Sequence, residues 1–457
     1  MGKTAGLKVG FARANINPPL GIHMTGYFKI RKAEGFLDDV EVCVIAFNYG
    51  EKTMAMIAVD NCGVGKDVFA RYRKNISEKV GLPIDAILIH STHTHTGPAL
   101  RKVGGISAEE TKVIEDYISF VEQRMIDVTN FAIKDLKPAK MGYGVGLAPN
   151  IAFIRRYRMK DGSVKTNPGV NNPDIVEPIG KVDERVSVLR FDREGATSVV
   201  LVNFANHPDT VGGNLISGDW PALTRRYVEK ILDNTSCIFF NGAEGDVNHV
   251  NVHPKKGDFN DMFNDFDGCS RGYGHTKYMA RVVTGGVLQA YDKVKYVEVN
   301  DINYLQKVVD IPANVPDPKD MPLAHKYNDL HNQGRDDEIP FKAMMLTTVV
   351  SEAARMVRLE HGPESFPFLL TSMSIGSVAI LGIPGEPFNA IGRALKVSDE
   401  WEFVIPLCYT NSAEGYFPMQ DSYDEGGYEA RGSNFKAGVG EKIIKYGSEL
   451  LTELKNK

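Results

Sequence analysis

Cysteine is scarce in this chain, with five residues among 457. They are odd in number and scattered without CxxC spacing, which argues against a disulfide framework or a cysteine zinc finger. No apolar stretch reaches 18 residues, so no membrane-spanning helix is predicted. Basic runs are absent too. The 53 Lys and Arg residues against 58 Asp and Glu residues give a formal charge of -5, which disfavours nucleic acid and anionic membrane surfaces as partners.

The N-terminal residues lack the features of a targeting signal. No apolar region and no small-residue cleavage site follow the first basic residues, and Gly6 stands where a myristoylation signal needs Ser or Thr. We therefore expect a cytoplasmic protein without a stable membrane anchor, provided that no leader has been trimmed.

What is present is the composition of an ordinary globular protein, 43% hydrophobic and 24% charged residues. Short β-branched runs alternate with longer helical patterns, which predicts an α/β fold with a mixed sheet flanked by helices. Strands are expected at 40–47, 54–59, 86–90, 186–191, 199–204, 237–240, 378–383 and 403–407. Helices are expected at 67–79, 108–136, 223–232, 276–293, 342–359 and 436–454.

The helix at 108–136 has the clearest pattern. Its apolar side chains recur mostly at three-to-four spacing, and Ser107 with Glu110 forms a capping box, so we expect this helix to pack on the sheet. The residues taken for its inner face are Val113, Tyr117, Phe120, Val121, Ile126 and Phe131.

Three segments are interpreted as loops. Residues 160–181 are rich in Pro, Gly, Asn and Asp, and residues 316–340 show no readable pattern. The acidic segment 258–274 lacks the ligand order of an EF-hand and is interpreted as a surface loop, with a calcium site as the alternative.

Polar clusters follow five of the expected strands directly, at 91–98, 206–208, 241–246, 385–387 and 410–412. In open α/β sheets the ligand crevice lies outside the carboxyl ends of the strands. We therefore expect these loops to meet at one site, although their convergence does not say which chemistry occurs there.

Single residues in these loops leave several interpretations open. His93 and His95 face the same way in an extended segment and could bind one ion, or could be two satisfied histidines at a strand end. His207 before Pro208 suits either a fixed ligand or a plain turn. Glu386 before Pro387 could simply begin a helix. HExxH and GxSxG are both absent, which excludes the common zincin and α/β-hydrolase sites.

Taken in order, six motifs form a recognisable set. They are MTGYF (24–28), STHTHTGP (91–98), NHP with LISGDWP (206–208 and 215–221), NGAEGDVN (241–248), IPGEPF (383–388) and NSAEGYFP with GGYEARGS (411–418 and 426–433). This set resembles the catalytic region of the neutral/alkaline, non-lysosomal ceramidase family, whose members are zinc-dependent amidases. The resemblance runs from about residue 9 to residue 433.

The resemblance implies one zinc ion (Zn²⁺) bound by four residues, His93, His207, Glu386 and Tyr428. It also implies a catalytic role for His95 as an acid or oxyanion partner. Arg155 is similar to the arginine of a family motif and is expected in the substrate pocket. Either Arg155 or its neighbour Arg156 could instead be a solvated loop residue.

Two departures from the family bear on the substrate. Asn248 occupies the position of a serine proposed as nucleophile, a role that a carboxamide cannot fill. The chain also ends soon after the last motif, so we expect residues 1–457 to form a single catalytic domain without the family's C-terminal immunoglobulin-like domain.

These features together predict a zinc-dependent hydrolase that cleaves an amide, or failing that an ester or lactone, through a metal-bound hydroxide. Asn248 is counted with the catalytic residues, and the expected substrate is a small molecule. Two alternatives stay open, a true ceramidase that hydrolyses N-acylsphingosine and a non-catalytic protein that binds a sugar or a lipid headgroup. The oligomeric state is not predicted.

Overall fold

Two β-sheets stacked face to face form the centre of the computed structural model, which describes residues 6–27, 30–255, 264–265, 269–270 and 272–457. The larger sheet has the strand order β16-β14-β13-β8-β1-β5-β6-β7, with β20 paired to β8, and the smaller has the order β21-β22-β23-β25. Within the described strands of these two sheets three pairs are parallel, β6 with β7, β14 with β16 and β23 with β25. The expected mixed sheet is confirmed.

The strands of the larger sheet are β1 (Lys8–Asn15), β5 (Glu41–Tyr49), β6 (Lys52–Val59), β7 (Ile87–Ser91), β8 (Lys137–Leu147), β13 (Arg185–Arg193), β14 (Ser198–Phe204), β16 (Thr235–Asn241) and β20 (Lys295–Val297). Those of the smaller sheet are β21 (Ile302–Pro312), β22 (Ser365–Ile375), β23 (Val378–Gly382) and β25 (Phe403–Leu407). All eight expected strands are present, while β1, β8, β21 and β22 were not predicted.

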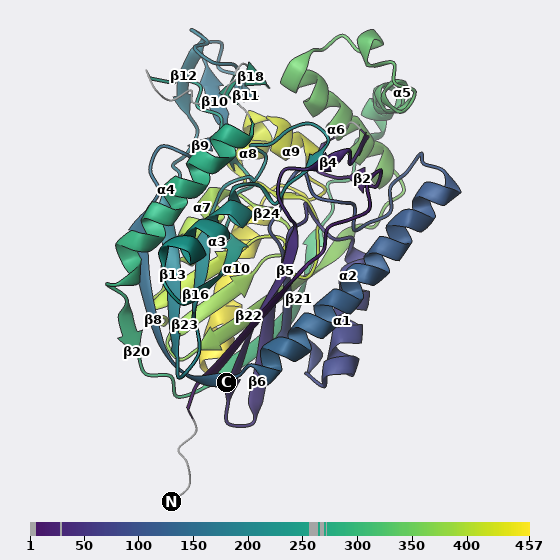
Figure 1. Cartoon of the computed structure of the whole chain (residues 1–457). Coiled ribbons are helices and arrows are strands. Elements are labelled where there is room, and N and C mark those ends of the chain that lie inside the picture. Colours follow the sequence, from purple (N-terminus) through teal and green to yellow (C-terminus); the bar gives the residue numbers. More distant parts are fainter. Residues whose placement is uncertain (1–5, 28–29, 256–263, 266–268, 271) are drawn as a thin grey trace, which may run out of the picture.

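Helices cover both outer faces of this sandwich (Figure 1). The larger sheet carries α1 (Lys66–Val80), α2 (Ala108–Lys134), α3 (Asp219–Ile231) and α4 (Tyr273–Tyr291), and the smaller carries α7 (Asn389–Leu395) and α10 (Val439–Lys455). Strand β5 shows why the layers form. Its alternate residues Val42 and Val44 belong to the core under α1 and α2, whereas Ile45 and Phe47 belong to the core between the sheets.

Helix α2 packs on β1 and β5 as expected, and its capping box is present, with Glu110 N donating to Ser107 Oγ over 3.2 Å. Its predicted inner face is partly wrong, because Val113, Phe120 and Phe131 are exposed. The other three predicted residues are buried, and they belong to a stripe with the helical period. It consists of Ile114, Tyr117, Ile118, Val121, Met125, Ile126, Val128, Thr129 and Ala132.

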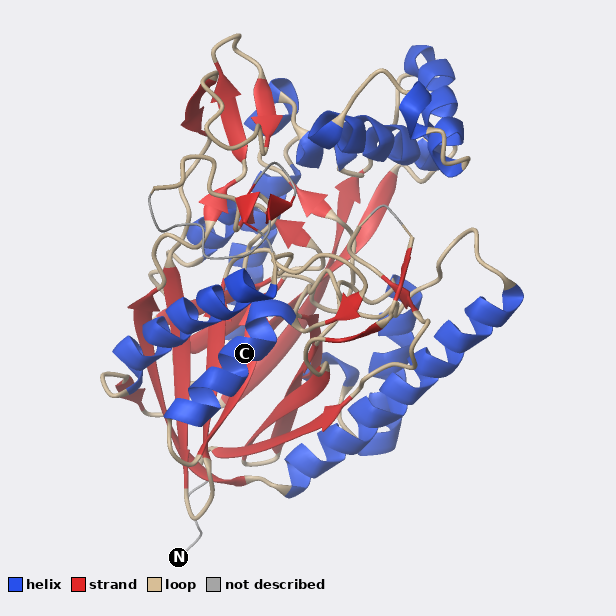
Figure 2. Ribbon diagram, turned by 45° about the horizontal axis from the view of Figure 1, so that its top comes forward, coloured by secondary structure: helices blue, strands red, loops and turns tan. Residues whose placement is uncertain are grey.

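Two segments interpreted as loops contain regular structure. Residues 316–340 hold α5 (Met321–Asn332), which packs against α6 (Ala343–Leu359). Residues 160–181 hold β11 (Val164–Thr166) and β12 (Ile175–Pro178), which pair with β10 (Arg156–Met159). The three-stranded sheet of β10, β11 and β12 and the α5–α6 pair lie at the same end of the sandwich, at the top of Figure 1 and again of Figure 2.

Short elements near this end complete the chain. They are β2 (His23–Met24), β3 (Arg31–Lys32), β4 (Gly35–Phe36), β9 (Phe153–Ile154), β15 (Leu215–Ile216), β17 (Val247–Asn248), β18 (Asn264–Asp265), β19 (Cys269–Ser270), β24 (Glu386–Pro387), β26 (Tyr416–Phe417), α8 (Asp421–Glu425) and α9 (Tyr428–Gly432). Most of the acidic segment 258–274 lies outside the described residues, so its interpretation as a loop is not addressed. Within the described ranges, no helix combines the length and the apolar character that a membrane crossing requires.

Candidate metal centre

The five loops expected to meet at the carboxyl ends of the strands do meet there. His93 follows β7, His207 follows β14, and Glu386 lies in β24 just after β23. The Nε2 atom of His207 is 3.1 Å from Glu386 Oε2, and the Nε2 atom of His93 is 3.6 Å from the same oxygen. One donor atom from each of the three side chains lies within 4.8 Å of the others, and all three residues are buried.

The backbone around these residues determines which imidazole nitrogen faces the carboxylate. The Nδ1 atom of His207 lies 2.9 Å from the carbonyl oxygen of Glu244, and that of His93 lies 2.5 Å from the carbonyl oxygen of Cys62. Because a carbonyl only accepts hydrogen bonds, each Nδ1 carries a proton and each Nε2 faces Glu386. Burial lowers the pKa of His93, but Cys62 and Glu386 outweigh it and raise the pKa to about 10, so a proton on His93 Nε2 takes the place of a cation here. A metal ion that displaced this proton would be faced by two imidazole nitrogens and a carboxylate. The donor set therefore fits a bound metal ion.

His93 is held in this orientation by an unusual backbone conformation. Its φ of +73° lies in the left-handed region, which costs free energy for a residue with a side chain and persists only where the surroundings enforce it. Here the His93 N–H donates to Asn61 O over 2.9 Å, and the preceding Thr92 N–H donates to Val59 O over 2.9 Å.

His95 completes a cluster of three imidazoles. Its Nε2 is 3.1 Å from His93 Nε2, and its ring centroid is 5.6 Å from that of His207. Burial and the neighbouring His93 lower the pKa of His95 well below its usual value. His95 is thus neutral at physiological pH and available to accept or donate a proton at the centre.

Tyr409 is a member of the centre that the sequence did not reveal. Its hydroxyl donates to Glu386 Oε1, and its ring stacks on His93 with centroids 4.3 Å apart. Burial raises the pKa of Glu386, but His93 and His207 outweigh it and hold the pKa well below its usual range. The only local signal for Tyr409 was its place directly before the polar cluster at 410–412.

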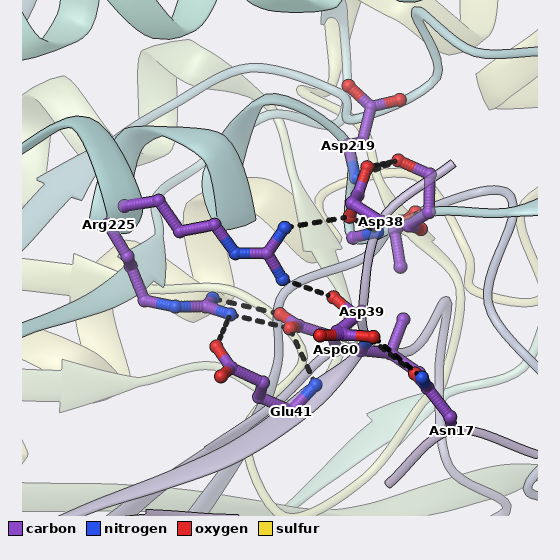
Figure 3. Close-up of polar contacts among 12 residues, drawn as sticks. Asn17, Asp38, Asp39, Glu41, Asp60, Asp219 and Arg225 are labelled. Atoms are coloured by element: carbon purple, nitrogen blue, oxygen red, sulfur yellow. Dashed lines mark hydrogen bonds and ion pairs between the residues drawn. The ribbon is translucent and has the colours of Figure 1, made fainter. Parts of the chain in front are cut away.

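A buried polar network lies behind the centre and joins α3 to the loop that carries His93 (Figure 3). Arg225 donates to both carboxylate oxygens of Asp60, over 2.9 and 2.6 Å, and also contacts Glu41. Asp60 in turn accepts a hydrogen bond from the hydroxyl of Thr92, the residue before His93. This network connects the helix layer to the metal-binding loop.

The fold can be compared with known proteins. No protein-family model and no curated protein matches the sequence. Among solved structures, the neutral ceramidase from Pseudomonas aeruginosa superposes with a TM-score of 0.71 at 16% identity, covering 99% of this chain and 75% of that one. A ceramidase complexed with C2 gives a TM-score of 0.72 at 15% identity, with 99% and 76% covered. The chain has the neutral ceramidase fold.

Of the four metal ligands implied by the ceramidase resemblance, Tyr428 is the one that lies outside the cluster of His93, His207 and Glu386. It begins α9, and its ring centroid is 5.5 Å from that of Tyr416, which in turn stacks on His207 at 6.4 Å. The ring of Tyr416 therefore lies between Tyr428 and the imidazole cluster. Its role as a ligand stays a prediction.

Arg155 and Arg156 are both buried, so the alternative of a solvated loop arginine is wrong. Arg155 Nε donates to Glu429 over 2.5 Å, and its guanidinium lies 5.5 Å from the ring of Tyr416. Arg156 donates to Glu425 over 3.0 Å. These partners lie in or beside α8, α9 and β26, so the arginines fasten the segment that carries Tyr428.

Asn248 lies in β17 and is 1% exposed. Its Nδ2 donates to Asn167 Oδ1 over 3.3 Å, while its Oδ1 accepts the N–H of Val250 over 3.0 Å. The carboxamide thus joins two loops near the centre, a contact that accounts for a polar residue at this buried position.

Proposed function

We propose that this protein is a zinc-dependent hydrolase that cleaves an amide bond, with His93, His207, Glu386 and Tyr428 as the metal ligands. The observation that carries the proposal is the convergence of two imidazole nitrogens and a carboxylate on one buried point. Nitrogen and oxygen donors in this combination are typical of catalytic zinc sites. A bound zinc ion would polarise the scissile carbonyl and lower the pKa of a water molecule toward 7.

The side chains around this point have separate roles in the proposed reaction. His95 moves a proton between water and the leaving group, because its ring lies beside His93 and is neutral at physiological pH. Tyr409 orients the carboxylate of Glu386 by hydrogen bonding to the oxygen that does not face His207. No acyl-enzyme forms, because Asn248 replaces the serine and an amide is not a nucleophile.

Elemental analysis of protein purified without chelators tests the proposal. We expect about one zinc per chain in the wild type and loss of zinc in the variant His93→Ala plus His207→Ala. The matched control is His325→Ala plus His331→Ala, which removes two histidines of α5 that pair with Glu360 and Asp336. Zinc retained at wild-type level in the first variant, with its fold intact by circular dichroism, would overturn the assignment.

We further propose that the substrate is a small, water-soluble amide, or an ester or lactone, rather than long-chain ceramide. The support is the family serine replaced by Asn248 and the lack of a basic or amphipathic stretch suited to a lipid surface. The test compares kcat/KM for ceramides of graded acyl length with that for short N-acyl amino acids, N-acyl sugars and lactones. Efficiency that rises with acyl length to about 10⁴ M⁻¹s⁻¹ would show a ceramidase instead.

A further inference from the structure

A second polar site lies beside the metal centre, in a cavity of about 380 Å³. The cavity is lined by His23, Met24, Thr25, Tyr27, Ile30, Arg101, Lys102, Val103 and Gly104. Three of these side chains are basic, and none of the lining residues is acidic. The volume is within the range of small-molecule binding sites.

The cavity and the metal centre share a wall formed by the segment 24–27. The ring of Tyr27, which lines the cavity, meets the ring of His95 edge-on at 5.4 Å. The backbone of Gly26 approaches His95 so closely that a Cβ atom there would lie 2.6 Å from His95 Cα, and its φ is +112°. The cavity and His95 thus lie on either side of the Tyr27 ring, and the MTGYF motif, which supplies that ring, belongs to both sites.

Two buried polar side chains of the cavity have unused hydrogen-bonding atoms. Thr25 is 5% exposed and His23 is 3% exposed, yet among the residues that the structure describes Thr25 Oγ1 and His23 Nδ1 have no hydrogen-bond partner. A buried polar atom without a partner costs free energy, and a bound ligand is one reason for it to persist. The hydroxyl of Thr25 can donate a hydrogen bond to an oxygen atom in the cavity, and His23 Nδ1 can do so in the ring form that carries a proton on Nδ1.

The cationic side chains of the cavity are also unpaired. Arg101 and Lys102 are exposed, and within the described part of the chain neither has a hydrogen bond or an ion pair. Asp67 lies beside Arg101, since a Cβ atom at Gly65 would lie 3.1 Å from Asp67 Oδ1 and 3.2 Å from Arg101 Cβ. A second acid, Glu110, lies 3.3 Å from His23 Nε2. Its carboxylate already pairs with Lys32 over 2.5 Å and caps α2 through the N–H of Ser107. Neither carboxylate forms an ion pair with Arg101 or Lys102 among the described residues, so these two cationic side chains are available to a ligand.

We propose that this cavity binds an oxyanion carried by the substrate, so that the hydrolysed compound is an amide with a carboxylate or phosphate group close to the scissile bond. The hydroxyl of Thr25 and the imidazole of His23 would hold the oxyanion, while Arg101 and Lys102 would attract it and balance its charge. The inference rests on the proposed hydrolase function and adds the class of substrate to it.

The test compares substrates that differ in one charged group. N-acetyl-leucine carries a carboxylate, N-acetyl-leucinol is its neutral counterpart, and N-acetyl-leucinol phosphate distinguishes the two oxyanions. The variants are Arg101→Gln plus Lys102→Gln, which changes only exposed side chains, and Thr25→Val, which removes one hydroxyl. The control is Lys230→Gln plus Lys445→Gln, an equal loss of charge on α3 and α10.

We expect the wild type to favour one of the charged substrates over the neutral one by about 10-fold or more in kcat/KM. The double variant at 101 and 102 and Thr25→Val should each lose about 10-fold on that substrate through KM, the scale of one charge-assisted contact. The loss on N-acetyl-leucinol should be smaller than the loss on the charged substrate, and the control should change neither value. Equal activity of the wild type on all three compounds, or an equal loss on charged and neutral substrates, would overturn the inference.

Binding to chelator-treated protein separates this inference from the proposed reaction. If the wild type binds N-acetyl-leucine or N-acetyl-leucinol phosphate in a calorimeter, and the double variant at 101 and 102 binds it about 10-fold more weakly, the oxyanion site stands even without hydrolysis. If N-acetyl-leucinol is hydrolysed and neither charged compound is bound or preferred, the hydrolase stands and the oxyanion site is refuted. The absence of both binding and hydrolysis refutes both.

Discussion

Replacing Arg225 by Met tests whether the network behind the metal centre is a structural requirement of the fold. Arg225 and Asp60 are each 1% exposed, and the guanidinium makes two parallel hydrogen bonds to the carboxylate. In Arg225→Met, Asp60 keeps its charge but retains only the N–H of Glu41 and the hydroxyl of Thr92 as donors. The variant therefore leaves a buried carboxylate without a cation.

Removal of one member of a buried ion pair costs about 3–5 kcal/mol, because the remaining charge stays desolvated. The entropy of unfolding is about 2.1 cal/mol/K per residue, so a cooperative chain of 457 residues loses about 1 °C in Tm for each kcal/mol. We therefore expect Arg225→Met to lower Tm by about 3–5 °C. It should also weaken zinc binding, since Asp60 supports the residue before His93.

Urea denaturation followed by circular dichroism measures the loss, and a double-mutant cycle with Asp60→Asn identifies its cause. The double variant removes both charges. Its loss in the free energy of unfolding should therefore be smaller than the sum of the two single losses by about 0.5–3 kcal/mol. The matched control is Arg226→Met, because Arg226 lies next on α3 but is 30% exposed and should cost less than about 1 kcal/mol. An additive cycle, or a loss for Arg225→Met no greater than that of the control, would refute the reasoning.

Three further predictions follow from single contacts. Burial raises the pKa of Asp183, but Arg185 and Lys396 outweigh it and hold the pKa at about 2, below its unfolded value of 3.8. This carboxylate therefore stabilises the fold above pH 4 and ceases to do so as pH falls toward 2. Between pH 4 and pH 2 the free energy of unfolding of Asp183→Asn should fall by about 2 kcal/mol less than that of the wild type. An equal fall in both proteins would contradict the prediction. Tyr409→Phe removes the hydroxyl that orients the carboxylate ligand and should weaken zinc binding about 10-fold in a chelator competition, whereas unaltered affinity would remove Tyr409 from the centre. His95→Ala should retain zinc and lower kcat about 100-fold, and a burst of product equal to the enzyme concentration in the wild type would show that an acyl-enzyme forms after all.

Local sequence patterns were sufficient for the strands that are apolar along most of their length. The runs that became β5, β6, β14 and β23 are rich in Val, Ile, Leu and Met and are buried on both faces, as strands between two packed layers are. Their polar ends were equally readable, because side chains that follow a buried strand emerge at the edge of a sheet. The convergence of the loops could thus be predicted before the order of the strands was known.

Strand β8 shows where local patterns fail. It contains three glycines at alternate positions, and glycine is depleted in strands. The structure explains them, because a Cβ atom at Gly146 would lie 1.8 Å from the carbonyl oxygen of Gly286 in α4. The glycines permit a close approach of helix α4 to the sheet. Residues 137–147 alone do not indicate that a helix packs there, so the strand could not be predicted from them.

Helix α5 was missed because its own sequence resembles that of a loop. Prolines at 316, 318, 322 and 340 surround it and indicated a loop, although Pro322 lies in the first turn of the helix, where proline is tolerated. Its inner face, including Met321 and Ala324, is completed only by α6. A short amphipathic helix of this kind cannot be separated from a loop until its packing partner is known.

The sequence by itself determined the fold class, eight strands and six helices, and the loops that carry His93, His95, His207 and Glu386, because these features depend on residues a few positions apart. Only the tertiary structure decided that the imidazole of His207 and the carboxylate of Glu386, 179 residues apart in the chain, lie 3.1 Å from each other. It alone placed Tyr409 on Glu386 and the basic cavity beside His95. Those contacts depend on the order of strands in two sheets, and that order is set by long-range packing, which no local period records.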